Sequence, residues 1–143
     1  MTAMEKVKSD LESMGVKLTA LNLSSVLAVS FEEGEIVINP DKLRGSKEVC
    51  DILCHEAGHF LTGSFYKLGD PYTSKLKLEG RASSAAFERY IPYSELLALL
   101  KEGRSEYEIS EHFGITEKML KLAYRYYTEY KGLSFGGDKK FTD

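Results

Sequence analysis

The stretch CHEAGHFLTG, residues 54–63, decides the fold predicted for this chain. Two of the three histidines, His55 and His59, stand four residues apart in it, and Glu56 follows the first. On a helix, residues at this spacing project to the same side, so both imidazoles can reach one ion. Glu56 is offset from that line, and its carboxylate can take a proton from a water bound to the ion. The stretch therefore predicts a zinc site with a general base, in preference to a helix with two surface histidines.

A catalytic zinc ion takes a third protein ligand and keeps one position open. His112, the remaining histidine, lies at a predicted break between helices, where an exposed polar role is expected. Among the carboxylates, Asp70 precedes a proline in a loop, and Glu88 lies on the opposite side of its helix from Glu79. The residues that share the face of Glu79 are all small: Ala82, Ser83 and Ala86. Because small residues let two helices approach closely, Glu79 is the preferred third ligand.

The composition fits a single globular domain of 143 residues, with 43% hydrophobic and 29% charged residues. The net charge of -3 provides no general basic field for nucleic acid. No stretch approaches the ~20 apolar residues of a membrane span, and the N-terminus is a charged amphipathic helix pattern, so a cytoplasmic location is expected. Cys50 and Cys54, one helical turn apart, are expected to be buried thiols rather than a disulfide or metal ligands.

The order of patterns predicts an α+β fold. The expected elements are a helix over residues 3–14, a hairpin of strands over 26–31 and 35–39, and helices over 46–62, 77–90 and 93–102, followed by two helices within 105–131. Gly34 is placed in the hairpin turn, Ser46 and Thr116 at helix N-caps, and residues 65–75 in a loop. The two strands predict a small antiparallel sheet, with the zinc helix packed beside the helix that bears Glu79.

Three segments are expected: a metallopeptidase-like core over residues 1–92, a helical subdomain over 93–131, and a flexible glycine-rich tail over 132–143. The second segment resembles a helix-turn-helix. However, residues 105–131 carry five acidic and four basic residues, a poor balance for contacting phosphates. We therefore expect this subdomain to pack on the core and to help hold a protein partner, rather than to bind DNA.

Residues that support the metal or the reaction are harder to choose. Asp51 stands one turn before His55 and is a candidate to hold its second ring nitrogen, with a solvated helix carboxylate as the alternative. The candidates for stabilising an oxyanion are Tyr66, Tyr72, Arg81 and Tyr90. The segment GEIVIN, residues 34–39, is either an exposed edge that binds an extended peptide or an ordinary core strand.

Over roughly residues 27–130 these motifs resemble the ImmA/IrrE-type metallopeptidases. The matching positions are Ile36, Ile38, Asn39 and Pro40 of I-x-I-N-P; His55 to Phe60 and Gly63 of H-E-x-G-H-F; the pair Phe65 and Tyr66; and Glu79, Arg81, Ala82, Ala86, Ile91 and Pro92 of the glutamate segment. The resemblance implies that Glu79 is the third zinc ligand, in agreement with the choice made above. One departure is Ala85, where members from mobile elements often have an aromatic residue.

The resemblance implies a cytoplasmic, gluzincin-like zinc protease of phages, prophages or integrative elements. Such proteases cleave a helix-turn-helix repressor encoded beside them and so derepress the genes of the element. Two other functions stay open: a non-catalytic metal-binding regulator that binds the repressor or DNA, and a general hydrolase of small peptides. The intact Glu56 favours an enzyme, because a purely structural zinc site needs no base.

Overall fold

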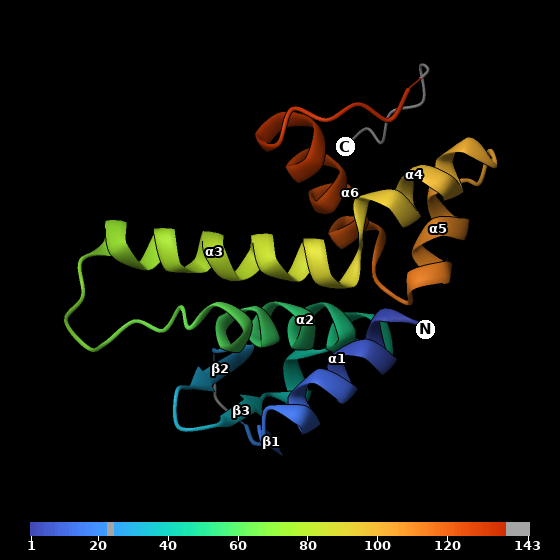
Figure 1. Cartoon of the computed structure of the whole chain (residues 1–143). Helices are drawn as coiled ribbons and strands as arrows, with labels where there is room; N and C mark the ends of the chain where they lie inside the picture. Colours follow the sequence, from blue (N-terminus) through green and yellow to red (C-terminus); the bar gives the residue numbers. More distant parts are fainter. Residues whose placement is uncertain (23–24, 137–143) are drawn as a thin grey trace.

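A computed structural model of the chain describes residues 1–22 and 25–136 (Figure 1). Its elements are α1 (Ala3–Ser13), β1 (Lys17–Ala20), β2 (Ala28–Phe31), β3 (Glu35–Ile38), the 3-10 turn η1 (Pro40–Lys42), α2 (Ser46–Thr62), α3 (Tyr72–Tyr90), α4 (Tyr93–Lys101), α5 (Glu106–Phe113), α6 (Glu117–Arg125) and the π-helical turn η2 (Tyr126–Tyr130). In Figure 1, α2 and α3 lie side by side in opposite directions, with the sheet and α1 on the far side of α2. The predicted α+β class is confirmed.

Helix α1 begins with a capping box. The Thr2 hydroxyl accepts a hydrogen bond from the Glu5 backbone N–H, and the Glu5 carboxylate accepts one from the Thr2 N–H. Ala3, Val7 and Leu11 are buried against the rest of the core, which fixes α1 beside α2.

The sheet is three-stranded with the order β1-β3-β2. Strands β2 and β3 form the predicted antiparallel hairpin, and Gly34 in its turn has φ 117°, which favours glycine. Strand β1 was not predicted, and it pairs with β3 in parallel, so the sheet is mixed rather than antiparallel. Its four residues, KLTA, alternate polar and apolar but are mostly exposed, and so short a run gives little sequence signal of a strand.

The position of β3 decides between the two alternatives left open for residues 34–39. Residues 34–39 were a candidate for the exposed edge, but β3 is the central strand, and Ile36 and Val37 are buried. Since a central strand has its backbone groups paired on both sides, it offers none to a peptide. The edge beside α2 is β2 instead.

Helix α2 carries the two histidines on one side and core residues on the other. Cys50, Leu53, Cys54 and Ala57 are buried, and the two cysteines are free thiols whose sulfurs lie 4.0 Å apart, as expected. The helix ends at Gly63 in the left-handed conformation, as predicted, but Ser46 is its first residue rather than its N-cap. Helix α3 starts directly after Pro71, so the predicted loop gives way to helix from Tyr72 onward.

The C-terminal helices share one buried cluster with the first three helices. The break at Gly114 is confirmed, and Thr116 caps α6 by accepting a hydrogen bond from the Met119 N–H. Of the tail predicted to be flexible, Phe135 is buried and packs on Tyr93 and Tyr124, with ring centres 4.9 Å apart in both pairs. Residues 137–143 lie outside the described part. No helix within the described ranges is long and apolar enough to span a membrane.

Candidate metal centre

Three donor groups from two helices converge beside the sheet. His55 and His59 of α2 each place Nε2 2.8 Å from the same atom, Oε2 of Glu79 on α3. The three ligand atoms all lie within 4.8 Å of one another, and no other such group of His, Cys, Asp and Glu occurs in the part of the chain described. Two imidazoles and a carboxylate are a donor set that zinc accepts, so these residues could hold the ion.

The two helices reach this arrangement because they are unusually close at Gly58. A Cβ atom built on Gly58 would lie 2.1 Å from the backbone oxygen of Ala82. Only a glycine fits between the two histidines at this contact, and the buried Ala82 and Ala86 keep the facing side of α3 small. The close approach brings Glu79 within reach of both rings.

The second nitrogen of each imidazole also has a partner. Nδ1 of His59 donates to the backbone oxygen of Ser64 at 2.5 Å, because a carbonyl can only accept. Nδ1 of His55 lies 3.1 Å from the hydroxyl of Ser83. Hydrogen bonds at Nδ1 orient the rings and leave Nε2 of His59 as the nitrogen that a metal would bind.

Glu56 is buried, with 6% of its surface exposed, and its Oε2 has no hydrogen-bond partner among the described residues. That atom lies 4.0 Å from Nε2 of His59. A buried carboxylate oxygen without a partner is costly, and its position beside the three donors fits a water molecule held at the same place by a metal ion. Burial raises the pKa of Glu56, against the opposing effect of the two histidines.

The ionisation of the donors reflects their mutual contacts. Hydrogen bonds from His55 and His59 hold the pKa of Glu79 well below its usual range, although burial opposes this. Burial lowers the pKa of His59, but hydrogen bonds to Glu79 and the Ser64 carbonyl outweigh it, so the pKa is raised. The centre therefore carries an ionised carboxylate that attracts a cation, and a metal would replace the proton shared between these groups.

The family comparison agrees with this geometry. The family model described as the IrrE N-terminal-like domain, peptidase family M78, matches residues 11–125, which is most of the chain. The chain belongs to the ImmA/IrrE-type metallopeptidase family. No curated protein and no solved structure matches it.

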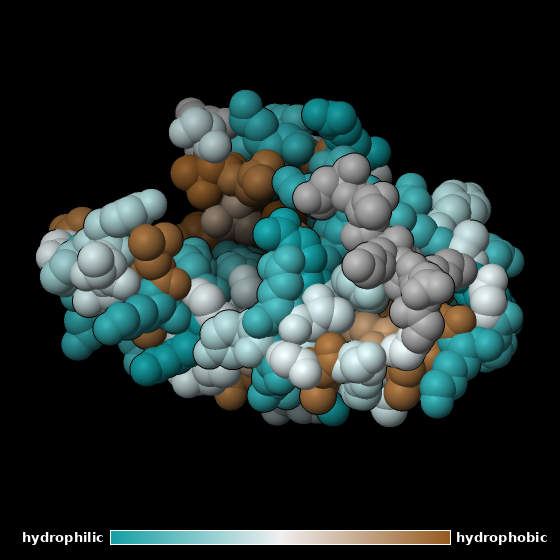
Figure 2. Space-filling model, turned by 90° about the horizontal axis from the view of Figure 1, so that it is seen from above, coloured by the Kyte–Doolittle hydropathy of each residue, from teal (hydrophilic) through white to brown (hydrophobic). Residues whose placement is uncertain are grey.

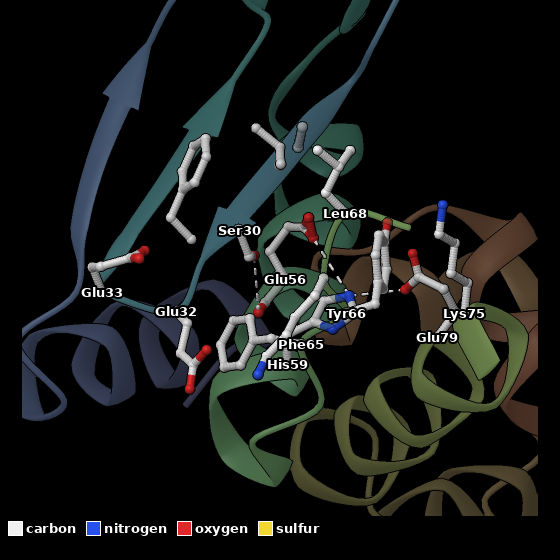
Figure 3. Close-up of a pocket in the computed structure, with 14 residues that line it drawn as sticks. Ser30, Glu32, Glu33, Glu56, His59, Phe65, Tyr66, Leu68, Lys75 and Glu79 are labelled. Carbon is white, nitrogen blue, oxygen red and sulfur yellow. Dashed lines mark hydrogen bonds and ion pairs between the residues drawn. The ribbon is translucent and has the colours of Figure 1, made fainter. Parts of the chain in front are cut away.

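A cavity of about 690 Å³ opens over the three donor groups, between β2, the segment after α2 and the start of α3. Its lining includes Glu56, His59, Phe65, Tyr66, Lys75 and Glu79, which Figure 3 shows around one space. The space-filling view shows the molecule hollowed beside a group of hydrophobic side chains (Figure 2). The Ser30 hydroxyl of β2 donates to the backbone oxygen of Glu56 at 3.5 Å, which ties the strand to α2.

The free edge of β2 runs along this cavity. The Asn39 N–H donates to the Leu27 carbonyl, so these two residues form a hydrogen-bonded pair. Bonded and non-bonded pairs alternate along an antiparallel ladder, so the backbone groups of Ala28 and Ser30 point away from β3. Both residues line the cavity, and their N–H and C=O groups can bind an extended peptide.

The other candidate ligands lie elsewhere. His112 pairs with Glu95 at 3.0 Å, Asp70 accepts a hydrogen bond from the Lys67 N–H, and Glu88 accepts one from the Tyr126 hydroxyl. Each of these side chains is thereby engaged in a local contact away from the centre. Only Glu79 among the acids considered contacts both histidines.

Of the two roles left open for Asp51, support of His55 and a solvated carboxylate, the structure shows neither. Its carboxylate accepts hydrogen bonds from the backbone N–H and the hydroxyl of Thr116, so it ties α2 to the start of α6. Ser83, on the neighbouring helix, takes the place expected for Asp51. Helix geometry brings i and i+4 residues near each other, but packing between helices decided which side chain faces the ring.

Of the four residues proposed to stabilise an oxyanion, Tyr66 lines the cavity and the other three do not. Tyr90 is buried and donates to Asp10, Tyr72 is 74% exposed at the start of α3, and Arg81 is exposed and does not line the cavity. Tyr66 does line it, and its ring centre lies 6.5 Å from that of His59. Burial and the nearby Glu79 raise the pKa of Tyr66, so its phenol keeps its proton.

Sequence reasoning missed Ser30, Ser64 and Ser83 as supporting groups. The sequence indicated Ser83 only as a small residue on the face of Glu79, and that placement is the one signal that could have identified it. Ser64 acts through its backbone oxygen, to which side-chain identity gives no clue.

Proposed function

We propose that this metallopeptidase is a zinc-dependent, site-specific endopeptidase that cleaves a helix-turn-helix repressor in the cytoplasm and so derepresses genes of a phage or mobile element. The observation that carries the enzymatic part is the buried oxygen of Glu56, which has no partner among the described residues and lies beside the three converging donors. A metal site that only stabilises the fold would not need a buried carboxylate aimed at it. The repressor as substrate rests on the family resemblance.

In the proposed reaction, His55, His59 and Glu79 would hold the zinc ion. The ion, when bound, supplies a Lewis acid that polarises the scissile carbonyl and lowers the pKa of water. Glu56 takes a proton from the attacking water at Oε2, and the water oxygen forms a bond to the carbonyl carbon. Glu56 then delivers that proton to the amide nitrogen as the C–N bond breaks, which releases an amine and a carboxylate. Tyr66 donates a hydrogen bond from its phenol to the oxygen that gains negative charge.

The edge of β2 positions the substrate in this proposal. An extended segment of the repressor pairs with the backbone groups of Ala28 and Ser30 that point away from β3. Ser30 places this edge beside α2, through its hydrogen bond to the Glu56 backbone. Main-chain pairing selects for extended, unfolded segments and is nearly indifferent to their side chains. Cleavage is therefore expected in a linker or loop of the repressor rather than within one of its helices.

The main alternative is a regulator that binds the repressor without cutting it. The packed C-terminal helices α4–α6, which share the core of the catalytic part, are compatible with such a binding role. A general peptide hydrolase is the third function, and turnover of unstructured casein would favour it.

The test is co-expression of the neighbouring repressor with the wild-type protein or with Glu56→Gln, followed by measurement of the repressor's intact mass. The substitution keeps the ligands and the shape of the base but removes its ability to take a proton. A single cut made only by the wild type supports the proposal and locates the bond. An intact repressor in both samples, with zinc bound and the two proteins co-purifying, would support the regulator instead.

A further inference from the structure

Lys75 stands at the cavity and has no anionic partner among the described residues. It lies on α3 one turn before Glu79, lines the cavity, and is half-buried. Its Nζ lies over the Tyr66 ring, 5.6 Å from the centroid. In the described part of the chain, no carboxylate oxygen comes within 4.0 Å of this ammonium, and the other lysine that lines the cavity, Lys67, is exposed to solvent. A partly desolvated cation that faces a cavity favours an incoming anion.

The opposite side of the cavity has the opposite charge. Glu32 and Glu33, in the exposed turn between β2 and β3, line it there, and Figure 3 shows them across from Lys75 with Glu56 and His59 between. An acidic side chain of a bound peptide is repelled at the hairpin turn and attracted at α3. The separation of negative charge at the hairpin turn from positive charge on α3 therefore favours one direction and one register of a bound peptide. It also favours peptides that carry an acidic residue on the α3 side.

We propose that Lys75 is a specificity-determining residue that selects peptides with an Asp or Glu side chain beside the scissile bond, on the α3 side of the cavity. This inference rests on the proposed function, because it takes the cavity to be the substrate site. Lys75 is one helical turn from the metal-binding Glu79, so the side chain that it meets belongs to a residue close to the cleaved bond. The cation–π contact with the Tyr66 ring, which also lines the cavity, favours a position of Nζ beside the cavity.

A purely local role for Lys75 makes a different prediction. If the lysine only offset the charge of Glu79, its replacement would change metal affinity and leave peptide preference unaltered. The experiment therefore reads out peptide preference by binding, without any need for turnover, and measures zinc affinity in the same proteins.

The probe is a phage-displayed library of random 12-residue peptides, selected against zinc-loaded Glu56→Gln protein. The same selection is made with Lys75→Glu and with Lys77→Glu added to that background. Lys77 is the matched control, because it is an exposed lysine on the same helix that does not line the cavity, and its replacement changes the net charge equally. Lys75→Arg tests whether positive charge alone is sufficient.

The selected peptides should be enriched in Asp and Glu about fivefold, the effect of one partly exposed ion pair. Lys77→Glu and Lys75→Arg should keep this enrichment, and Lys75→Glu should replace it with enrichment of Lys and Arg. The inference is overturned if Lys75→Glu selects the same peptides as the parent, or if the parent shows no acidic preference or no enrichment. The proposed function is tested separately, by cleavage of the repressor with protein in which Glu56 is intact. The proposed function and the inference about Lys75 can therefore fail independently.

Discussion

Gly58 of α2 and Ala82 of α3 touch backbone to backbone, so closely that a Cβ on Gly58 would lie 2.1 Å from the Ala82 oxygen. Gly58 stands between the two histidines, and Ala82 stands three residues after Glu79. The contact therefore sets the distance between the two halves of the metal centre. A residue that has no donor atom is in this way part of the site.

Gly58→Ala should separate the helices and damage the site. The new methyl group meets backbone, which cannot rotate away, so we expect a loss of about 1–3 kcal/mol in the free energy of unfolding. Zinc affinity should fall with it, because His55 and His59 move away from Glu79. Urea denaturation of the metal-free protein and a zinc titration measure the two effects.

Gly80→Ala is the matched control for that substitution. Gly80 is exposed within α3, a Cβ added to it would meet nothing within 4 Å among the described residues, and its φ is not positive. Alanine is the better helix former by about 0.5–1 kcal/mol, so this variant should be more stable and bind zinc normally. Equal destabilisation by both substitutions would contradict the role assigned to the Gly58 contact.

Ser83→Ala should weaken zinc binding while leaving the fold intact. Its hydroxyl lies 3.1 Å from Nδ1 of His55 and orients the ring. Loss of such a supporting hydrogen bond lowers metal affinity by about tenfold or more. Competition with a chromophoric chelator measures the affinity, and Ser84→Ala, one residue along the helix, serves as the comparison. Identical affinities for the two variants would show that Ser83 does not position His55.

Asp51→Ala should destabilise the protein without lowering zinc affinity. The Thr116 N–H and hydroxyl would lose their acceptor at the start of α6, a loss of about 1–3 kcal/mol. Asp51→Asn keeps one oxygen that can accept a hydrogen bond from Thr116.

Burial raises the pKa of Asp51, so the folded state binds a proton more readily than the unfolded state does. The ionised carboxylate therefore lowers the stability of the fold as the pH rises. Near pH 7 the Asn variant should therefore be at least as stable as the wild type. Weaker zinc binding by Asp51→Ala than by the wild type would contradict this prediction and would show that Asp51 helps to position His55.

Asp10→Asn should make the stability less sensitive to acid. Arg89 donates two hydrogen bonds to Asp10 at 2.8 and 2.9 Å, and Tyr90 donates a third. The contact with Arg89, helped by Tyr90 and opposed by burial, lowers the pKa of Asp10 from 3.8. This stabilisation is therefore fully present above pH 3.8 and is lost as the pH falls through the folded-state pKa. The wild type should exceed the variant by about 1 kcal/mol at pH 6, and the difference should shrink towards pH 3. Chemical denaturation at several pH values measures it, and a difference that does not change with pH would contradict the assignment.

Helical spacing made the core of the site predictable. His55, Glu56 and His59 follow one another within a single helix, where backbone hydrogen bonding fixes side-chain directions from the sequence alone. The choice of Glu79 required more, namely that the small residues sharing its face allow close packing. The contact of Gly58 with Ala82 gives that inference its physical basis, because the two backbones meet without side chains between them.

The sequence by itself determined the α+β class, the helix that carries His55, Glu56 and His59, and Glu79 as the acid beside the two histidines, because each depends on local periodicity or on residue size. Tertiary structure alone decided that β3 is central, that β2 borders the cavity and that β1 pairs in parallel. It also decided that Ser83 faces His55 while Asp51 faces Thr116. These features depend on which surfaces meet between elements distant in the chain, and neither spacing nor residue type within one element encodes that choice.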